Sequence, residues 1–148
     1  MNIAIGADQG GFELKRKVVE YLIDLGHQVI DLGIHEVKSV DYPDIAESIA
    51  RAVTNGEAER GIAICGTGIG MSIAANKVPG IRAALCTDCY TARMAREHND
   101  AQILCLGGRV TGVGSALEIV RTFLTTDAHD GRHSRRIQKI SALDEKER

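Results

Sequence analysis

The chain has 148 residues, which fits one domain with its own hydrophobic core. Hydrophobic residues make up 44% of it and charged residues 26%, a composition typical of a folded globular protein rather than a disordered one. The net charge of −2 gives no reason to expect nucleic acid as a partner. With no apolar run of about 18 residues and no charged-then-apolar leader, we expect no membrane span and a cytoplasmic location.

Five short apolar segments alternate with helical segments along the chain. The expected strands are 2–6, 28–33, 61–65, 82–86 and 101–106. The expected helices are 12–25, 43–55, a short one after 65–70, 88–97, 112–125 and about 132–147. This alternation predicts one α/β domain over 1–148, a three-layer α/β/α sandwich around a five-stranded parallel sheet. In the first helix, Leu14, Val18, Leu22 and Leu25 should share the buried face.

A glycine-rich loop beginning at Cys65 is the most informative stretch. It follows an apolar strand and has glycine at every second position, namely Gly66, Gly68 and Gly70. Glycine allows a ligand to approach the backbone closely, and free N–H groups at a helix start can surround an anion. A thiol at the mouth of such a site has its thiolate favoured by the helix. The loop therefore predicts catalysis, with Cys65 as a general base and the N–H groups holding an enediolate oxygen. A buried strand-end thiol beside a tight turn is the structural alternative.

Ligands of parallel α/β sheets bind beyond the carboxyl ends of the strands. Asp8 and Gln9 follow the first expected strand and Arg109 follows the fifth, so both should lie near Cys65. Asp8 could instead cap the first helix. His98 and Asn99 precede the fifth strand, so dimerisation or a bent loop would have to bring them to the site.

A basic cluster, Arg132, His133 and Arg136, opens the last helix. Arg132 and Arg136 are four residues apart and share a helix face, which suits a phosphate group. A solvated basic face is the alternative. Together with Arg109 and the glycine loop, these cations predict a sugar phosphate as ligand.

Two of the four cysteines have a spacing found in redox and zinc sites. Cys86 and Cys89 form a C-x-x-C pair, but no second pair or histidine couple accompanies it. We therefore expect no metal at this pair. The glycine loop matches neither the P-loop nor the dinucleotide-binding pattern, so we also expect no cofactor. The pair is expected to be structural, with Cys86 ending a strand and Cys89 in the following turn.

Taken together, these motifs resemble the ribose-5-phosphate isomerase B family, which also contains galactose- and allose-phosphate isomerases. The resemblance covers nearly the whole chain. It is carried by residues 6–8, 39–44, 65–77, 80–84, 96–99, 107–109 and 131–136. It implies a Rossmann-like sandwich and a homodimer or tetramer with the active site at the subunit interface. It also implies metal-free interconversion of ribose 5-phosphate and ribulose 5-phosphate in the pentose phosphate pathway.

The resemblance also implies roles for individual residues. Cys65 aligns with the proton-transferring base, with Thr67 beside it, and His98 aligns with the residue that helps open the sugar ring. The implied sugar and enediolate contacts are Asp8, Gln9, Gly66, Gly68, Ile69, Gly70 and Asn99. The implied phosphate contacts are Arg109, Arg132, His133 and Arg136.

The chain departs from the family pattern at Gln9, where a histidine is usual. Glutamine donates hydrogen bonds but carries no charge and shuttles no proton. Isomerisation of allose 6-phosphate or another hexose 6-phosphate is therefore the nearest alternative function. A sugar-phosphate binder without catalysis is an alternative of a different class.

Overall fold

The computed structural model describes residues 1–146. Its centre is one sheet of five parallel strands in the order β2-β1-β3-β5-β4, which confirms the expected architecture. The strands are β1 (Asn2–Ala7), β2 (Gln28–Asp31), β3 (Arg60–Cys65), β4 (Ala83–Leu85) and β5 (Ile103–Gly107).

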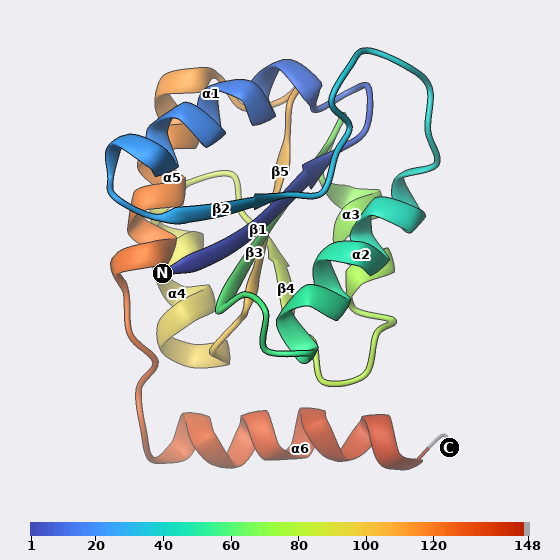
Figure 1. Ribbon diagram of the computed structural model, residues 1–148. Helices are drawn as coiled ribbons and strands as arrows, with labels where there is room; N and C mark the ends of the chain where they lie inside the picture. Colours follow the sequence, from blue (N-terminus) through green and yellow to red (C-terminus); the bar gives the residue numbers. More distant parts are fainter. Residues whose placement is uncertain (147–148) are drawn as a thin grey trace.

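Helices cover both faces of this sheet (Figure 1). The helices are α1 (Phe12–Asp24), α2 (Tyr42–Thr54), α3 (Ile69–Ala75), α4 (Cys89–Asn99), α5 (Val113–Thr125) and α6 (Arg132–Lys146). The group α1, α4 and α5 packs on one face, and the pair α2 and α3 packs on the other.

The hydrophobic core consists of two layers, one on each face of the sheet. Successive side chains of a strand point to opposite faces, so Ile62 and Ile64 join the layer under α1, α4 and α5. Ala63 and Cys65 join the layer under α2 and α3. Both faces of the strands are thus buried, which explains why the strands are short apolar runs rather than alternating sequences.

Several elements end one or two residues earlier than the sequence suggests, among them β2 and α1. The strand expected over 28–33 ends at Asp31, whose carboxylate accepts hydrogen bonds from Lys15 Nζ at 2.7 Å and from the Gly33 N–H at 3.0 Å. The first helix ends at Asp24, so Leu25 lies beyond its last turn and is 43% exposed. The prediction that Leu25 shares the buried face was therefore wrong, whereas Leu14, Val18 and Leu22 are buried.

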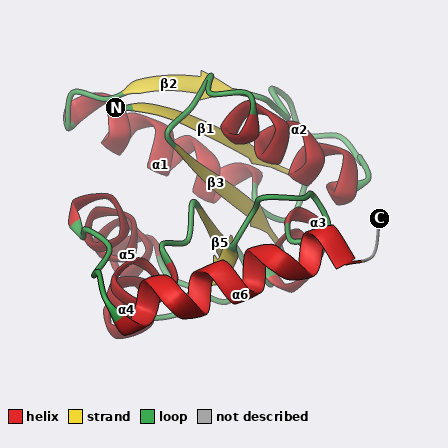
Figure 2. Ribbon diagram, turned by 90° about the horizontal axis from the view of Figure 1, so that it is seen from below, coloured by secondary structure: helices red, strands yellow, loops and turns green. Residues whose placement is uncertain are grey.

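Helix α6 lies apart from the two layers, across the edge of the sheet where the strands begin. Seen from below, it runs from beside α4 toward the end of α3 (Figure 2). The Asp144 carboxylate of α6 accepts a hydrogen bond from the Gly80 N–H at 2.8 Å, which ties the helix to the segment before β4. The expected end of this helix, residue 147, lies outside the described residues. No helix within residues 1–146 is both long and apolar enough to cross a membrane.

The two leucines at the end of α1 give a matched test of this packing. Leu22 is fully buried and Leu25 is exposed, so Leu22→Ala should lower the free energy of unfolding by about 2–5 kcal/mol. The change Leu25→Ala should cost less than about 1 kcal/mol. Urea titration of both variants measures the two free energies of unfolding. Equal losses would contradict the difference in burial between Leu22 and Leu25.

Candidate functional site

Cys65 is the last residue of β3 and is 5% exposed. Its Sγ accepts a hydrogen bond from the Gly68 N–H at 3.1 Å. Thr67, which is exposed, accepts one at Oγ1 from the Ile69 N–H at 3.2 Å. The loop therefore turns back on its own first residue, and this fixes the sulfur at the start of α3.

The loops that follow β1, β3 and β5 pack backbone against backbone at this edge of the sheet. A Cβ atom at Gly10 would lie 2.8 Å from the backbone nitrogen of Gly66. One at Gly107 would lie 2.6 Å from the Thr67 carbonyl oxygen, and one at Gly108 would lie 2.5 Å from the carbonyl oxygen of Gly10. No side chain fits between these loops, so the three strand ends form one compact unit.

Asp8, Gln9 and Arg109 lie at the same edge, as the strand topology predicts. The Asp8 carboxylate is almost buried and accepts a hydrogen bond from the Gly10 N–H at 2.9 Å. The residue that caps α1 is Gly11, so the alternative in which Asp8 caps this helix is wrong. The Arg109 guanidinium lies along Gly66, because a Cβ atom there would be 3.2 Å from Arg109 Nη1.

A hollow of about 560 Å³ opens beside Asp8 and Gln9. The Gln9 Oε1 accepts a hydrogen bond from the Val40 N–H at 3.1 Å, which joins this loop to the segment before α2. That segment supplies the other residues that line the hollow: Ser39, Val40, Asp41, Tyr42, Pro43 and Asp44.

Residues 39–44 had no predicted role in the site, although they are part of the resemblance. The Tyr42 ring packs on the glycine loop, since a Cβ atom at Gly70 would meet it at 2.5 Å. The only local signal in this segment was Pro43 at a helix start. A proline there marks where the helix begins but does not show which residues the segment contacts.

His98 and Asn99, at the end of α4, form a second cluster with Arg132, His133 and Arg136, at the start of α6. The rings of His98 and His133 are stacked, with centroids 4.1 Å apart and planes 9° apart. His129, which the sequence did not single out, has its ring centroid 6.2 Å from that of His133. Within residues 1–146, neither Arg132 nor Arg136 forms an ion pair.

His133 is the one buried side chain of α6. Desolvation lowers its pKa, and the nearby His98, Arg132 and Arg136 lower it further. A neutral imidazole at this position avoids adding another positive charge to a cluster that already carries two guanidinium groups.

The two clusters lie at opposite edges of the sheet. Cys65 follows a strand, whereas α4 ends beside the start of β5 and α6 crosses that same edge (Figures 1 and 2). The connection from α4 to β5 stays at that edge, so no bent loop carries His98 to Cys65. Within one chain, the residues expected to form one site therefore lie in two separate groups, one around Cys65 and one around His98 and the start of α6. We call these groups the two half-sites.

The Cys86–Cys89 pair is not bonded, and its surroundings do not favour redox chemistry. Cys86 lies just after β4, and burial raises the pKa of its thiol to about 11. Cys89 is the first residue of α4 rather than part of a turn. Burial also raises the pKa of Cys105. Residues 1–146 contain no group of three or more His, Cys, Asp or Glu side chains arranged to hold a metal ion.

The sequence profile of the Ribose/Galactose Isomerase family matches residues 3–140, and the chain belongs to this family. It is 44% identical over 144 residues to ribose-5-phosphate isomerase B of Escherichia coli, which covers 97% of each chain. It is 42% identical over 149 residues to D-erythrulose-4-phosphate isomerase of Pectobacterium atrosepticum, covering 100% of this chain and 98% of that one. The solved structure of Clostridium thermocellum ribose-5-phosphate isomerase B superimposes with a TM-score of 0.99, at 55% identity and with 100% of both chains covered.

The left-handed conformation of Gly68 provides a test of the loop. Its φ is +82°, and a Cβ atom there would lie 2.5 Å from Leu85 Cδ1 and 2.9 Å from the Leu106 carbonyl carbon. Gly68→Ala should therefore lower the free energy of unfolding by at least about 1–2 kcal/mol. Gly114, in α5, has open space around it, and Gly114→Ala should change stability by less than about 1 kcal/mol. Thermal unfolding compares the two, and a neutral Gly68→Ala would contradict the described loop.

Proposed function

We propose that this chain is an aldose–ketose isomerase that interconverts D-ribose 5-phosphate and D-ribulose 5-phosphate. The observation that carries the proposal is similarity over the full length, at 55% identity and a TM-score of 0.99, to a protein that bears this name. The relative from Escherichia coli supports it independently. A thiol, a glycine loop and a basic cluster in one chain supply the groups that this chemistry needs.

In the proposed reaction Cys65 is the base at the reacting carbons. With the sugar in its open-chain form, the Cys65 thiolate takes the proton from C2, and the electrons of that bond form an enediolate with negative charge on oxygen. A proton moves from the C2 hydroxyl to the C1 oxygen, and the thiol returns its own proton to the C1 carbon, which leaves a carbonyl at C2 and a hydroxyl at C1. Gly66, Gly68, Ile69 and Gly70 are proposed to stabilise the oxygen from the loop, with Thr67 beside the thiol.

The second cluster is proposed to open the sugar ring and hold the phosphate. His98 exchanges a proton with the ring oxygen, and Asn99 donates to a sugar hydroxyl. Arg132, His133 and Arg136 bind the phosphate, together with Arg109 from the other half-site. Binding energy from the phosphate, which does not react, holds C1 and C2 against the thiol.

Because the two half-sites lie at opposite edges of one chain, the proposed active unit is a homodimer. Each active site would combine Cys65 of one subunit with His98 and α6 of the other. Helix α6 crosses the edge of the sheet with apolar side chains still exposed, Ile140 at 42% and Leu143 at 57%. A symmetric dimer buries the same surface on both subunits and forms two equivalent sites.

Two other sugar phosphates compete with ribose 5-phosphate as the preferred substrate. The relative from Pectobacterium atrosepticum is named for a four-carbon sugar phosphate, and its identity of 42% is close to the 44% of the Escherichia coli enzyme. Gln9 beside the hollow keeps allose 6-phosphate as the third candidate, because glutamine replaces the usual titratable histidine.

Turnover of ribose 5-phosphate to ribulose 5-phosphate in the presence of EDTA is the direct test. Cys65→Ala should lower kcat by about 10²–10⁴, the usual contribution of a positioned general acid or base. Cys89→Ala is the matched control, because this thiol lies at the start of α4, and it should leave kcat unchanged. Parallel measurements of kcat/KM on erythrulose 4-phosphate and allose 6-phosphate rank the three substrates.

Each outcome of this assay has a distinct meaning. Fast turnover that Cys65→Ala retains would contradict the assignment of the base. Turnover that EDTA abolishes would contradict a metal-independent reaction. Saturable binding of all three sugar phosphates without turnover would identify a binder rather than an enzyme.

Mixing two inactive variants tests the shared site. In a dimer of Cys65→Ala with His98→Ala, one site carries both changes and the other carries neither. Random exchange of subunits makes half of the dimers mixed, so about a quarter of wild-type activity should return. No recovery in a mixture shown by mass spectrometry to contain mixed dimers would contradict a site built from two subunits.

A further inference from the structure

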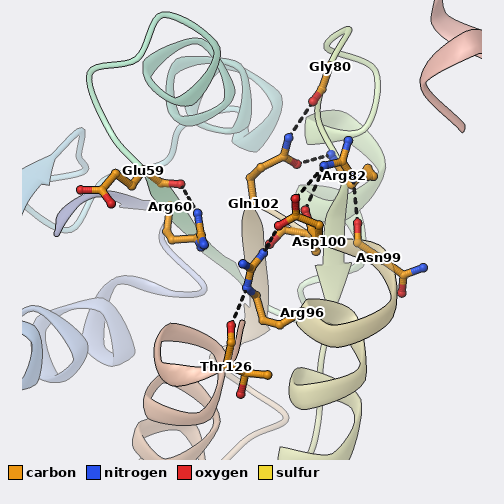
Figure 3. A network of polar contacts seen from close by, with 10 residues as sticks. Glu59, Arg60, Gly80, Arg82, Arg96, Asn99, Asp100, Gln102 and Thr126 are labelled. Carbon is orange, nitrogen blue, oxygen red and sulfur yellow. Dashed lines mark hydrogen bonds and ion pairs between the residues drawn. The ribbon is translucent and has the colours of Figure 1, made fainter. Parts of the chain in front are cut away.

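Arg96 is a buried arginine near the end of α4, 2% exposed, and its guanidinium donates three hydrogen bonds (Figure 3). Its Nη1 donates to Asp100 Oδ1 at 2.7 Å and to the Ala101 carbonyl at 2.7 Å. Its Nε donates to the Thr126 carbonyl, just beyond α5, at 3.1 Å. The side chain therefore fastens the end of α4 to the neighbouring helix.

Arg82 approaches the same helix end from the segment before β4. Its Nε donates to the Asn99 carbonyl at 2.8 Å, and its Nη2 donates to the Asp100 carbonyl at 3.0 Å (Figure 3). The Arg82 backbone is fixed in turn, because its N–H donates to Gln102 Oε1 at 2.8 Å. Gln102 Nε2 donates to the Gly80 carbonyl at 2.8 Å, which completes the network.

This arrangement fixes the direction of a helix end. The last carbonyls of a helix have no partner inside it, and water usually satisfies them. Here the carbonyl of Asn99, the last residue of α4, and those of Asp100 and Ala101 just after it accept hydrogen bonds from Arg82 or Arg96. Asp100 has φ +44°, a left-handed conformation that is uncommon outside glycine, and its carboxylate is held by Arg96.

The side chains carried by this helix end have no such support of their own. Within residues 1–146, neither the His98 ring nor the Asn99 amide has a side-chain hydrogen bond, and the His98 ring contacts His133 by stacking. Where these two side chains point therefore depends on the backbone at the end of α4. The backbone, in turn, depends on the guanidinium groups and on Asp100.

We propose that Arg82, Arg96 and Asp100 are positioning residues for the isomerisation, because they hold the end of α4 so that His98 and Asn99 reach the sugar. The inference rests on the proposed function, in which these two side chains contact substrate. Arg82, Arg96 and Asp100 do not touch the sugar themselves. Their hydrogen bonds hold the last turn of α4 in one orientation.

The test uses variants that spare the buried core. Arg82→Ala removes the two bonds to the carbonyls of Asn99 and Asp100, and its side chain is partly exposed. Asp100→Ala removes the carboxylate and disfavours the left-handed conformation at this position, whereas Asp100→Asn still accepts a bond from Arg96 and tolerates that conformation. Arg16→Ala is the control, because Arg16 forms an exposed ion pair with Glu13 in α1.

We expect Arg82→Ala and Asp100→Ala to lower kcat by at least about tenfold, since small misplacements of reacting groups cost that much or more. KM should change by less than about threefold, because the phosphate contacts of α6 remain. Asp100→Asn and Arg16→Ala should stay within about threefold of wild type in kcat. All assays run well below the measured unfolding temperature of each variant, so lost stability alone would leave kcat unchanged.

A second readout does not need turnover. The carbon-bound proton signals of the His98 ring in NMR spectra, assigned with His98→Asn, should shift in Arg82→Ala and Asp100→Ala but not in Arg16→Ala. Folded Arg82→Ala and Asp100→Ala variants with wild-type kcat would overturn the proposal. If the wild type turns over none of the sugar phosphates, the proposed function fails. In that case the NMR readout still tests the positioning role, and unchanged His98 signals in both variants would overturn it.

Discussion

Contact between bare backbones at the carboxyl edge of the sheet is the constraint on which this structure depends. The loops after β1, β3 and β5 approach so closely that Gly10, Gly107 and Gly108 have no room for a Cβ atom. This contact fixes where Cys65, Asp8 and Arg109 stand relative to one another. The Cys65 thiol is held there by the backbone, because its Sγ accepts a hydrogen bond from the Gly68 N–H.

The polarity of a parallel sheet explains why one chain holds only half of each proposed site. All carboxyl ends of the strands lie at one edge, and the helices α1 to α5 return the chain to the other. Residues that follow strands therefore lie near Cys65, whereas His98, at the end of α4, lies beside α6. Pairing two copies is the simplest way to bring opposite edges together, and the proposed sugar-phosphate site then depends on the proposed dimer.

The two edges are stabilised by different means. At the carboxyl edge, glycine lets backbones touch. At the other edge, Arg82 and Arg96 satisfy the carbonyls at the end of α4, and the carboxylate of Asp100 lies between them. Within residues 1–146, the His98 ring and the Asn99 amide at this edge form no side-chain hydrogen bond, whereas Cys65, Asp8 and Gln9 at the carboxyl edge each accept one from a backbone N–H.

The sequence by itself determined the five strands, their alternation with helices, the glycine loop after β3 and the residues at each strand end, because local periodicity and glycine placement carry that information. It also supported the family through motifs spread over the whole chain. Only the tertiary structure decided that Leu25 is exposed and that residues 39–44 line the hollow. It also decided that His98 and Cys65 lie at opposite edges of the sheet. Exposure at a helix end and the meeting of distant segments depend on how elements pack in three dimensions, and no pattern within a single segment records that packing.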